Sequence, residues 1–222
     1  IRNIAKKYKI KLIEDAAQTH GSSYKKKFPG YFSDVATFSF YPTKNLGAIG
    51  EGGAIITNNK KIYERTKRMR SWSHNKHDFF EIGFNYRMTE FSAISLLSKL
   101  KFLNNDINKR NWIAKKYKDN LKAKNYSIFN EKIKKHSYHI FAITVNKKKR
   151  SNIIAKLKSK GIDTNIHYPY NLSELKVFNK KNYKLSSPIS HKISKEFLSL
   201  PIYPELEVKK ILYICKILNQ TL

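Results

Sequence analysis

Short apolar runs and helical patterns alternate along the first 72 residues of the chain. Three runs rich in apolar and β-branched residues predict buried strands, and they cover residues 10–15, 35–40 and 52–58. Residues 59–72 place Ile62, Thr66 and Met69 at helical spacing, which predicts a helix with these side chains facing inward. Residues 2–8 have the pattern of the end of another helix. Strands that alternate with helices or loops are typical of an α/β sheet, here expected to be largely parallel.

A long helical pattern covers residues 88–122, after a polar, histidine-containing segment at 73–87 that we expect to be a loop. Apolar residues recur along this helix at helical spacing: Phe91, Ile94, Leu97, Leu100 and Leu103. We interpret the aromatic side chains of this helix as core residues rather than as a platform that stacks on nucleic-acid bases. A helix of this length is expected to connect two domains.

The pattern changes beyond residue 120. Residues 137–145 alternate as a half-exposed antiparallel strand does, and residues 150–162 predict a helix that Gly161 ends. The loop 167–172 follows, and residues 206–218 form an amphipathic pattern with Ile211, Ile214, Cys215 and Leu218 on one face. We therefore predict two domains, 1–120 and 121–222.

Composition is that of a globular protein, with 41% apolar and 13% aromatic residues in 222. No apolar run approaches the roughly 20 residues of a membrane helix, and the first residues lack the apolar core of a signal peptide, so we expect no membrane insertion. A single cysteine, Cys215, rules out an internal disulfide framework and favours a cytoplasmic location. The histidines at 20, 74 and 77 lack the spacing of metal ligands, so we expect no metal site.

The formal net charge of +29 raises the alternative of a basic protein that binds nucleic acid. Lysines outnumber arginines by 38 to seven, and they are spread from Lys6 to Lys216. Arginine is preferred for bidentate contacts to phosphates and bases, and a nucleic-acid site needs its charge in a patch. We therefore interpret the charge as general surface charge, with no specific nucleic-acid partner.

One lysine, Lys44, lies in a loop between the second and third predicted strands and is followed by four glycines. Asp15 ends the first predicted strand, and Ser39 lies near the end of the second. The carboxyl ends of parallel strands converge on one crevice, so an amine, a carboxylate and a hydroxyl are expected to meet there. Pyridoxal 5'-phosphate (PLP) uses a lysine amine, a carboxylate beside its ring nitrogen and donors for its phosphate. Taken alone, Asp15 could instead cap a helix, and Ser39 could be a satisfied core hydroxyl.

Three literal motifs occur in order: EDAAQTHG at 14–21, SDVATFSFYPTKNLGAIGEGGAIITN at 33–58 and GFNYRMTEFSAI at 83–94. Together they resemble the DegT/StrS family of sugar aminotransferases, which are PLP enzymes of fold type I. GIDTNIHYPYNL at 161–172 and FLSLPIYPELEVKKI at 197–211 are similar to segments of the family's small domain. The resemblance implies an α/β fold: the C-terminal part of a large, mainly parallel-sheet domain over 1–120, with a long connecting helix, then a small α+β domain over 121–222.

The resemblance also implies roles for individual residues. Lys44 matches the Schiff-base lysine, Asp15 the partner of the pyridine nitrogen, and Gln18 the side chain that contacts the ring oxygen. Ser39 matches a phosphate ligand, and Asn85 matches an asparagine that reaches the phosphate across the interface of a homodimer. His167 and Tyr168 fall where the family approaches its sugar-nucleotide substrate, although His167 could instead pack within its loop. Some relatives are dehydratases with histidine in place of the lysine, and Lys44 argues against that variant.

The function implied by the resemblance is transfer of an amino group, with L-glutamate as donor, to a nucleotide-linked keto-sugar in amino-sugar or surface-polysaccharide biosynthesis. The motif GFNYRMTE is more similar to members that act at the 4-keto position than to those that act at the 3-keto position. Family chains are longer at the N-terminus, and this sequence begins with isoleucine, so we expect that it starts within a longer protein. The missing part would supply a phosphate-binding loop and a ring-stacking aromatic, which leaves a truncated, catalytically incompetent chain as the alternative.

Overall fold

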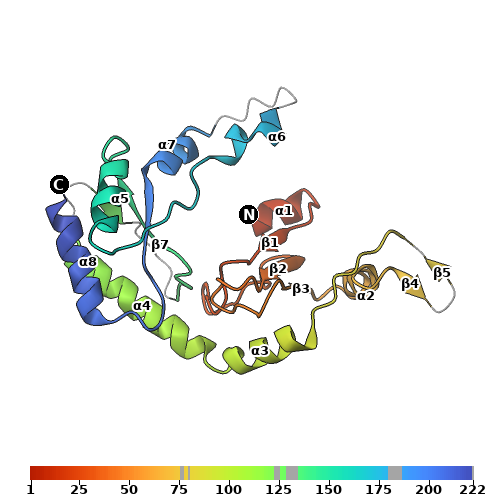
Figure 1. Cartoon of the computed structure of the whole chain (residues 1–222). Coiled ribbons are helices and arrows are strands. Elements are labelled where there is room, and N and C mark those ends of the chain that lie inside the picture. Colours follow the sequence, from red (N-terminus) through yellow and green to blue (C-terminus); the bar gives the residue numbers. More distant parts are fainter. Residues whose placement is uncertain (76–77, 80, 123–125, 129–134, 180–186, 222) are drawn as a thin grey trace. The chain divides into compact units, whose positions relative to one another are not determined.

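The computed structural model describes residues 1–75, 78–79, 81–122, 126–128, 135–179 and 187–221 (Figure 1). The chain divides into two units, Ile1–Asn108 with Ile133–His139, and Lys109–Lys132 with Ile140–Leu222. The division falls inside a helix, and a short later segment returns to the first unit. The assignment of a domain boundary near residue 120 stays a prediction.

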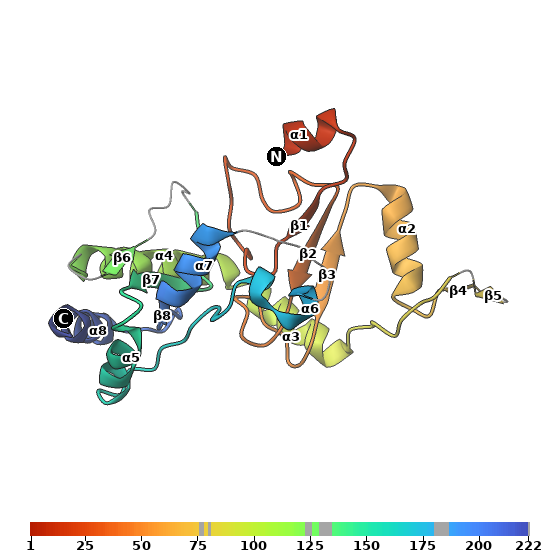
Figure 2. The ribbon, with the colours of Figure 1, turned by 90° about the horizontal axis from the view of Figure 1, so that it is seen from above.

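The first unit contains a three-stranded sheet in the order β1 (Ile13–Asp15), β2 (Val35–Ser39) and β3 (Gly53–Ile56) (Figure 2). All three predicted strands are therefore confirmed. β1 and β2 are parallel, with Asp15 opposite Thr37. β3 runs antiparallel to β2, because the chain reverses between them without a crossover connection.

Two helices flank this sheet in the sequence, α1 (Arg2–Lys7) and α2 (Lys60–Met69). The side chain of Asn59 caps α2 by accepting a hydrogen bond from the Ile62 N–H. Ile62, Thr66 and Met69 are the partly buried side chains of α2, as the sequence predicts. The segment expected to be a loop contains two short antiparallel strands, β4 (His74–Asn75) and β5 (Asp78–Phe79).

The prediction of a single long helix over 88–122 is wrong, because the structure has two helices, α3 (Glu90–Leu100) and α4 (Leu103–Asn120). Between them the Phe102 N–H bonds to the carbonyl of Lys99, three residues back, and Lys101 keeps helical backbone angles. The interruption is a tightened turn rather than a sharp reversal. Neither proline nor glycine marks it in the sequence.

The expected core stripe of α3 is also exposed in this structure. Its members are 81%, 62%, 64% and 52% exposed: Phe91, Ile94, Leu97 and Leu100. The buried residues of α3 are Ser92 and Leu96. The expectation that the aromatic residues belong to the core therefore holds for Tyr117 of α4, which is fully buried, and fails for Phe91.

Polar side chains explain which face of α3 is buried. The Ser92 hydroxyl donates to the carbonyl of Ile49 at 2.6 Å, and the Lys99 ammonium donates to the carbonyl of Gly47 at 2.7 Å. Leu96 packs in the same place with Leu46 and Ala48. Because α3 bonds to loop carbonyls, its buried face contains polar residues. The apolar periodicity of its sequence therefore follows the opposite, exposed face.

The second unit contains an antiparallel sheet in the order β6 (Tyr126–Ile128), β7 (Phe141–Val145) and β8 (Phe197–Leu200). Its other elements are α5 (Arg150–Lys158), η1 (Leu172–Glu174), α6 (Lys176–Asn179), α7 (Pro188–Glu196) and α8 (Val208–Gln220). β7 alternates between buried and partly buried side chains, and Gly161 follows α5 with φ +72°. The predicted face of α8 is buried, including Ile211 and Cys215. Within the described segments, no helix has the length and apolar character needed to span a membrane.

Candidate active site

The two parallel strands of the first unit bring a carboxylate and a hydroxyl to the same edge and face of the sheet. Asp15 is the last residue of β1 and pairs with Thr37 of β2, so their side chains point to one face. Ser39 ends β2 two residues later and returns to that face. Lys44 follows five residues farther along the chain. The sequence predicted this convergence of strand ends, and the register agrees with it.

The Asp15 carboxylate is exposed and caps a turn rather than a helix. Its Oδ1 accepts a hydrogen bond from the Ala17 N–H at 3.0 Å, and the Thr19 N–H closes the turn onto the carbonyl of Ala16. Within the described part of the chain, Oδ2 of Asp15 has no hydrogen-bond partner. One carboxylate oxygen therefore orients the side chain, and the other is available to a ligand.

A tight turn presents Lys44. The Lys44 N–H donates to the carbonyl of Tyr41 at 2.9 Å, and the Ser39 hydroxyl accepts a bond from the Tyr41 N–H at 3.3 Å. A Cβ on Gly47 would overlap the carbonyl of Pro42, so the return of the loop requires glycine there. The Lys44 ammonium makes no hydrogen bond or salt bridge to any residue that the structure describes.

The four glycines that follow Lys44 differ in backbone conformation and in surroundings. Gly50 alone has a positive φ, +91°. A Cβ on Gly53 would lie 2.9 Å from the carbonyl of Phe38, so this position needs close approach of the backbone rather than unusual angles. The loop is therefore shaped mainly by close packing.

His20, which the sequence pattern excludes as a metal ligand, is buried next to this site. Its ring packs against Phe38 and Phe40, with centroid separations of 5.4 and 5.8 Å, and is 4% exposed. Neither ring nitrogen has a hydrogen-bond partner within the described residues. Burial, together with the positive charge of Lys44, lowers the pKa of His20 from 6.5 to about 4. His20 is therefore neutral at pH 7, and its place two residues after Gln18 in EDAAQTHG was the available sequence signal.

Gln18 lies in the turn after β1, where its side chain is partly buried. Its carbonyl accepts a 2.6 Å hydrogen bond from the hydroxyl of Ser137. The carbonyl of Ser137 in turn accepts a 2.7 Å bond from the side-chain amide of Asn45, the neighbour of Lys44. Ser137 could not be identified from the sequence, because a serine at the start of a predicted strand carries no signal of its own.

Asn85 is not joined to the groups on β1 and β2 within this chain. Its side chain is exposed and accepts a hydrogen bond from the Arg87 guanidinium at 3.0 Å, and its backbone bridges to Ser71. An exposed Asn85 is compatible with the predicted contact across a dimer interface, which stays a prediction.

His167 and Tyr168 belong to the second unit. His167 Nδ1 lies 2.9 Å from the hydroxyl of Ser199, and its ring meets the ring of Tyr168 edge-on at 5.6 Å. Tyr168 is 61% exposed. These contacts give His167 a partner within its own unit, as loop packing requires, and its role toward a substrate stays a prediction.

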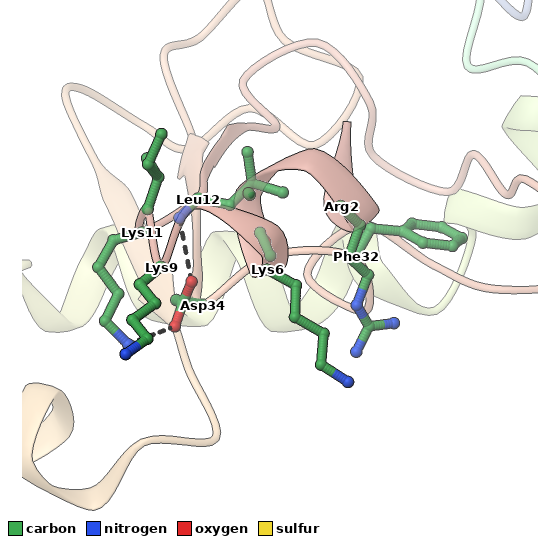
Figure 3. Close-up of a pocket in the computed structure, with 10 residues that line it drawn as sticks. Arg2, Lys6, Lys9, Lys11, Leu12, Phe32 and Asp34 are labelled. Atoms are coloured by element: carbon green, nitrogen blue, oxygen red, sulfur yellow. Dashed lines mark hydrogen bonds and ion pairs between the residues drawn. The ribbon is translucent and has the colours of Figure 1, made fainter.

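A cavity of about 550 Å³ lies elsewhere in the first unit, beside α1 (Figure 3). Basic side chains line it, including Arg2, Lys6 and Lys9, and its carboxylate Asp34 accepts hydrogen bonds from the Lys11 ammonium and the Leu12 N–H. These bonds hold the pKa of Asp34 below its usual value, the Leu12 N–H contributing most. The cavity contains none of the predicted site residues. Over the part of the chain that is described, no cluster of His, Cys, Asp and Glu could hold a metal ion.

Comparison with known proteins identifies what this chain is similar to. The model of the DegT/DnrJ/EryC1/StrS aminotransferase family matches residues 1–219. The dTDP-3-amino-3,6-dideoxy-alpha-D-galactopyranose transaminase of Aneurinibacillus thermoaerophilus is 38% identical over 99% of this chain and 60% of its own length. The UDP-2-acetamido-2-deoxy-3-oxo-D-glucuronate aminotransferase of Pseudomonas aeruginosa is 34% identical over 99% of this chain and 60% of its own length.

A solved structure of an aminotransferase also matches this chain. The crystal structure of DesV from S. venezuelae, in complex with a ketimine intermediate, superposes with a TM-score of 0.91 at 30% identity. The match covers 99% of this chain and 60% of that one. The α/β fold of an aminotransferase of this kind is thereby confirmed. The chain spans about 60% of the length of the curated relatives described above.

Proposed function

Because the chain belongs to the DegT/DnrJ/EryC1/StrS aminotransferase family, whose members are PLP-dependent, we propose that it transfers an amino group to a nucleotide-linked keto-sugar. The amino donor in this proposal is L-glutamate, and the product serves amino-sugar or surface-polysaccharide biosynthesis. The observation that carries the proposal is the Lys44 amine, which has no hydrogen bond or salt bridge among the described residues and follows the strand edge where Asp15 and Ser39 converge.

The residues present fit PLP. When bound, PLP supplies an electron-withdrawing ring that carries the amino group between donor and acceptor. The Oδ2 of Asp15, which has no partner among the described residues, suits a contact that keeps the ring nitrogen protonated, and the Ser39 hydroxyl suits a phosphate oxygen. Lys44 Nζ would hold the cofactor and move a proton at the reacting substrate carbon. A neutral His20 adds no charge that would repel the Lys44 ammonium.

Anionic substrates suit the charge of this protein. A net charge of +29 attracts a nucleoside diphosphate by long-range electrostatics, without specifying the base. His167 and Tyr168 are the residues we propose for contact with the sugar nucleotide. The names of both relatives above refer to position 3 of the sugar, whereas GFNYRMTE favours the 4-keto position, so both positions belong in the test.

A homodimer is part of this proposal, because Asn85 is exposed and is proposed to serve the cofactor phosphate of a second subunit. Inactive Lys44→Ala subunits mixed with inactive Asn85→Ala subunits should regain activity, since a hybrid rebuilds one complete site. Hybrids that form and remain inactive would count against a shared site. A cytoplasmic location also belongs to the proposal, and the lone Cys215 is buried and free, with its pKa raised to about 12 by burial.

The test is a panel of nucleotide-linked 3-keto and 4-keto sugars, each incubated with the protein, PLP and L-glutamate, with product mass as the readout. We expect an amino-sugar product from one position, and none from the Lys44→Ala variant. Amination of free small keto acids alone would refute the sugar assignment. No turnover of any substrate, by a protein that still binds PLP, would support the alternative of a catalytically incompetent family member.

A further inference from the structure

Ser137 connects two loops of the candidate active site that are far apart in the sequence. Its hydroxyl donates a 2.6 Å hydrogen bond to the carbonyl of Gln18, in the loop after β1. Its own carbonyl accepts a 2.7 Å bond from the amide of Asn45, in the loop after β2. One residue therefore fixes the separation of the loop that carries Gln18 and the loop that carries Lys44.

The surroundings of Ser137 make these bonds rigid. Ser137 is 3% exposed, so water does not compete for its hydroxyl or its carbonyl. The Ser23 N–H donates to the carbonyl of Lys135 at 3.0 Å, which anchors the same segment to the first loop a second time. The Tyr138 N–H donates to His136 Nδ1 at 2.9 Å, which closes a local turn around Ser137.

Short local connections join each loop residue that bonds to Ser137 to a proposed site residue. A displacement at Ser137 would therefore also displace Asp15 and Lys44. On the first loop, the turn from Ala16 to Thr19 links the carbonyl of Gln18 to the Asp15 carboxylate that caps it. On the second loop, Asn45 is the direct neighbour of Lys44. A shift of either loop therefore changes the distance between the Asp15 carboxylate and the Lys44 amine. The geometry of a bound ligand is sensitive to that distance.

We propose that Ser137 is a positioning residue of the cofactor site, which holds the Gln18 loop and the Lys44–Asn45 turn at the separation that PLP requires. This inference rests on the proposed function for the identity of the ligand. It assigns the residue no contact with cofactor or substrate, and its effect is transmitted through Gln18 and Asn45.

The test uses Ser137→Ala, which removes the hydroxyl and keeps the carbonyl, and Ser137→Thr, which restores the hydroxyl. The matched control is Ser194→Ala in the second unit, where a serine that is 5% exposed also donates to a carbonyl, that of His191 at 2.9 Å. Two readouts are measured on the same preparations: equilibrium affinity for PLP, and amide hydrogen exchange of residues 16–24 and 41–48 without PLP.

We expect Ser137→Ala to weaken PLP binding about tenfold, the effect of one buried hydrogen bond, and to speed exchange in both segments. Ser137→Thr and Ser194→Ala should bind PLP within about twofold of the unchanged protein. Equal affinity and equal exchange in Ser137→Ala would overturn the proposal, and so would equal losses in Ser137→Ala and Ser194→Ala. If the unchanged protein binds no PLP, the proposed function fails, and the exchange measurement still decides whether Ser137 holds the two loops.

Discussion

His20 makes the stability of the protein depend on pH in a way that the structure quantifies. The imidazole is buried against Phe38 and Phe40 without a hydrogen-bond partner among the described residues, near the positive charge of Lys44. Both surroundings disfavour the protonated ring, and they lower its pKa from 6.5 to about 4. Between these two values the unfolded chain binds a proton that the native protein does not bind.

The sign and the magnitude of the change in unfolding free energy with pH follow from proton linkage. Because the native pKa is the lower one, the free energy of unfolding falls as the pH falls below about 6.5, and the loss ends below about pH 4. One pKa unit corresponds to about 1.4 kcal/mol, so His20 should remove about 2 kcal/mol of stability between pH 7 and pH 5. That is a large fraction of the stability of an ordinary domain.

Urea denaturation at pH 7 and at pH 5 measures this loss directly. His20→Phe and His20→Gln both lack the titrating group, so each should lose about 2 kcal/mol less than the unchanged protein between the two pH values. The two variants will differ in stability at pH 7, because one fills the apolar site and the other does not. An unchanged pH dependence in both variants would refute the neutral, buried state of His20.

Two further predictions concern the close approach at Gly47 and the buried hydroxyl of Tyr117. Gly47→Ala should cost roughly 2–3 kcal/mol of unfolding free energy, because its Cβ overlaps backbone, whereas Gly50→Ala meets open space and should cost about 1 kcal/mol through its positive φ; equal costs in urea denaturation would contradict the overlap. Tyr117→Phe should cost about 1–2 kcal/mol, because the buried hydroxyl donates to the carbonyl of Pro201 at 2.9 Å. The exposed Tyr213→Phe, with a contact of 3.4 Å, should cost less than about 0.5 kcal/mol, and a cost for Tyr117→Phe no larger than this would argue against that bond.

Local patterns predicted the elements of this fold where apolar side chains determine the packing. The strands β1, β2 and β3, the inward face of α2 and the buried face of α8 all follow from apolar periodicity. The face of α3 does not, because its helix binds loop carbonyls through Ser92 and Lys99 and leaves its apolar residues exposed. The tightened turn between α3 and α4 has no sequence marker at all.

The residues of the candidate site also divide into those that local patterns predict and those that they do not. The shared strand edge of Asp15 and Ser39 could be predicted, because parallel strands bring their ends together. The assignment of Lys44 rests on the motif that contains it and stays a prediction. His20 and Ser137 could not be predicted, since their importance lies in burial and in contacts over long sequence distances. Ser137 bonds to residues 119 and 92 positions away, which no local pattern contains.

The central claim is that Lys44, among 38 lysines, is the residue that holds PLP. The most direct measurement is reduction with borohydride after incubation with one equivalent of PLP, followed by peptide mass spectrometry. We predict one modified peptide, the one that contains Lys44, and its disappearance in Lys44→Ala. A modified peptide from another lysine, or labelling spread over many lysines in the unchanged protein, would contradict the assignment.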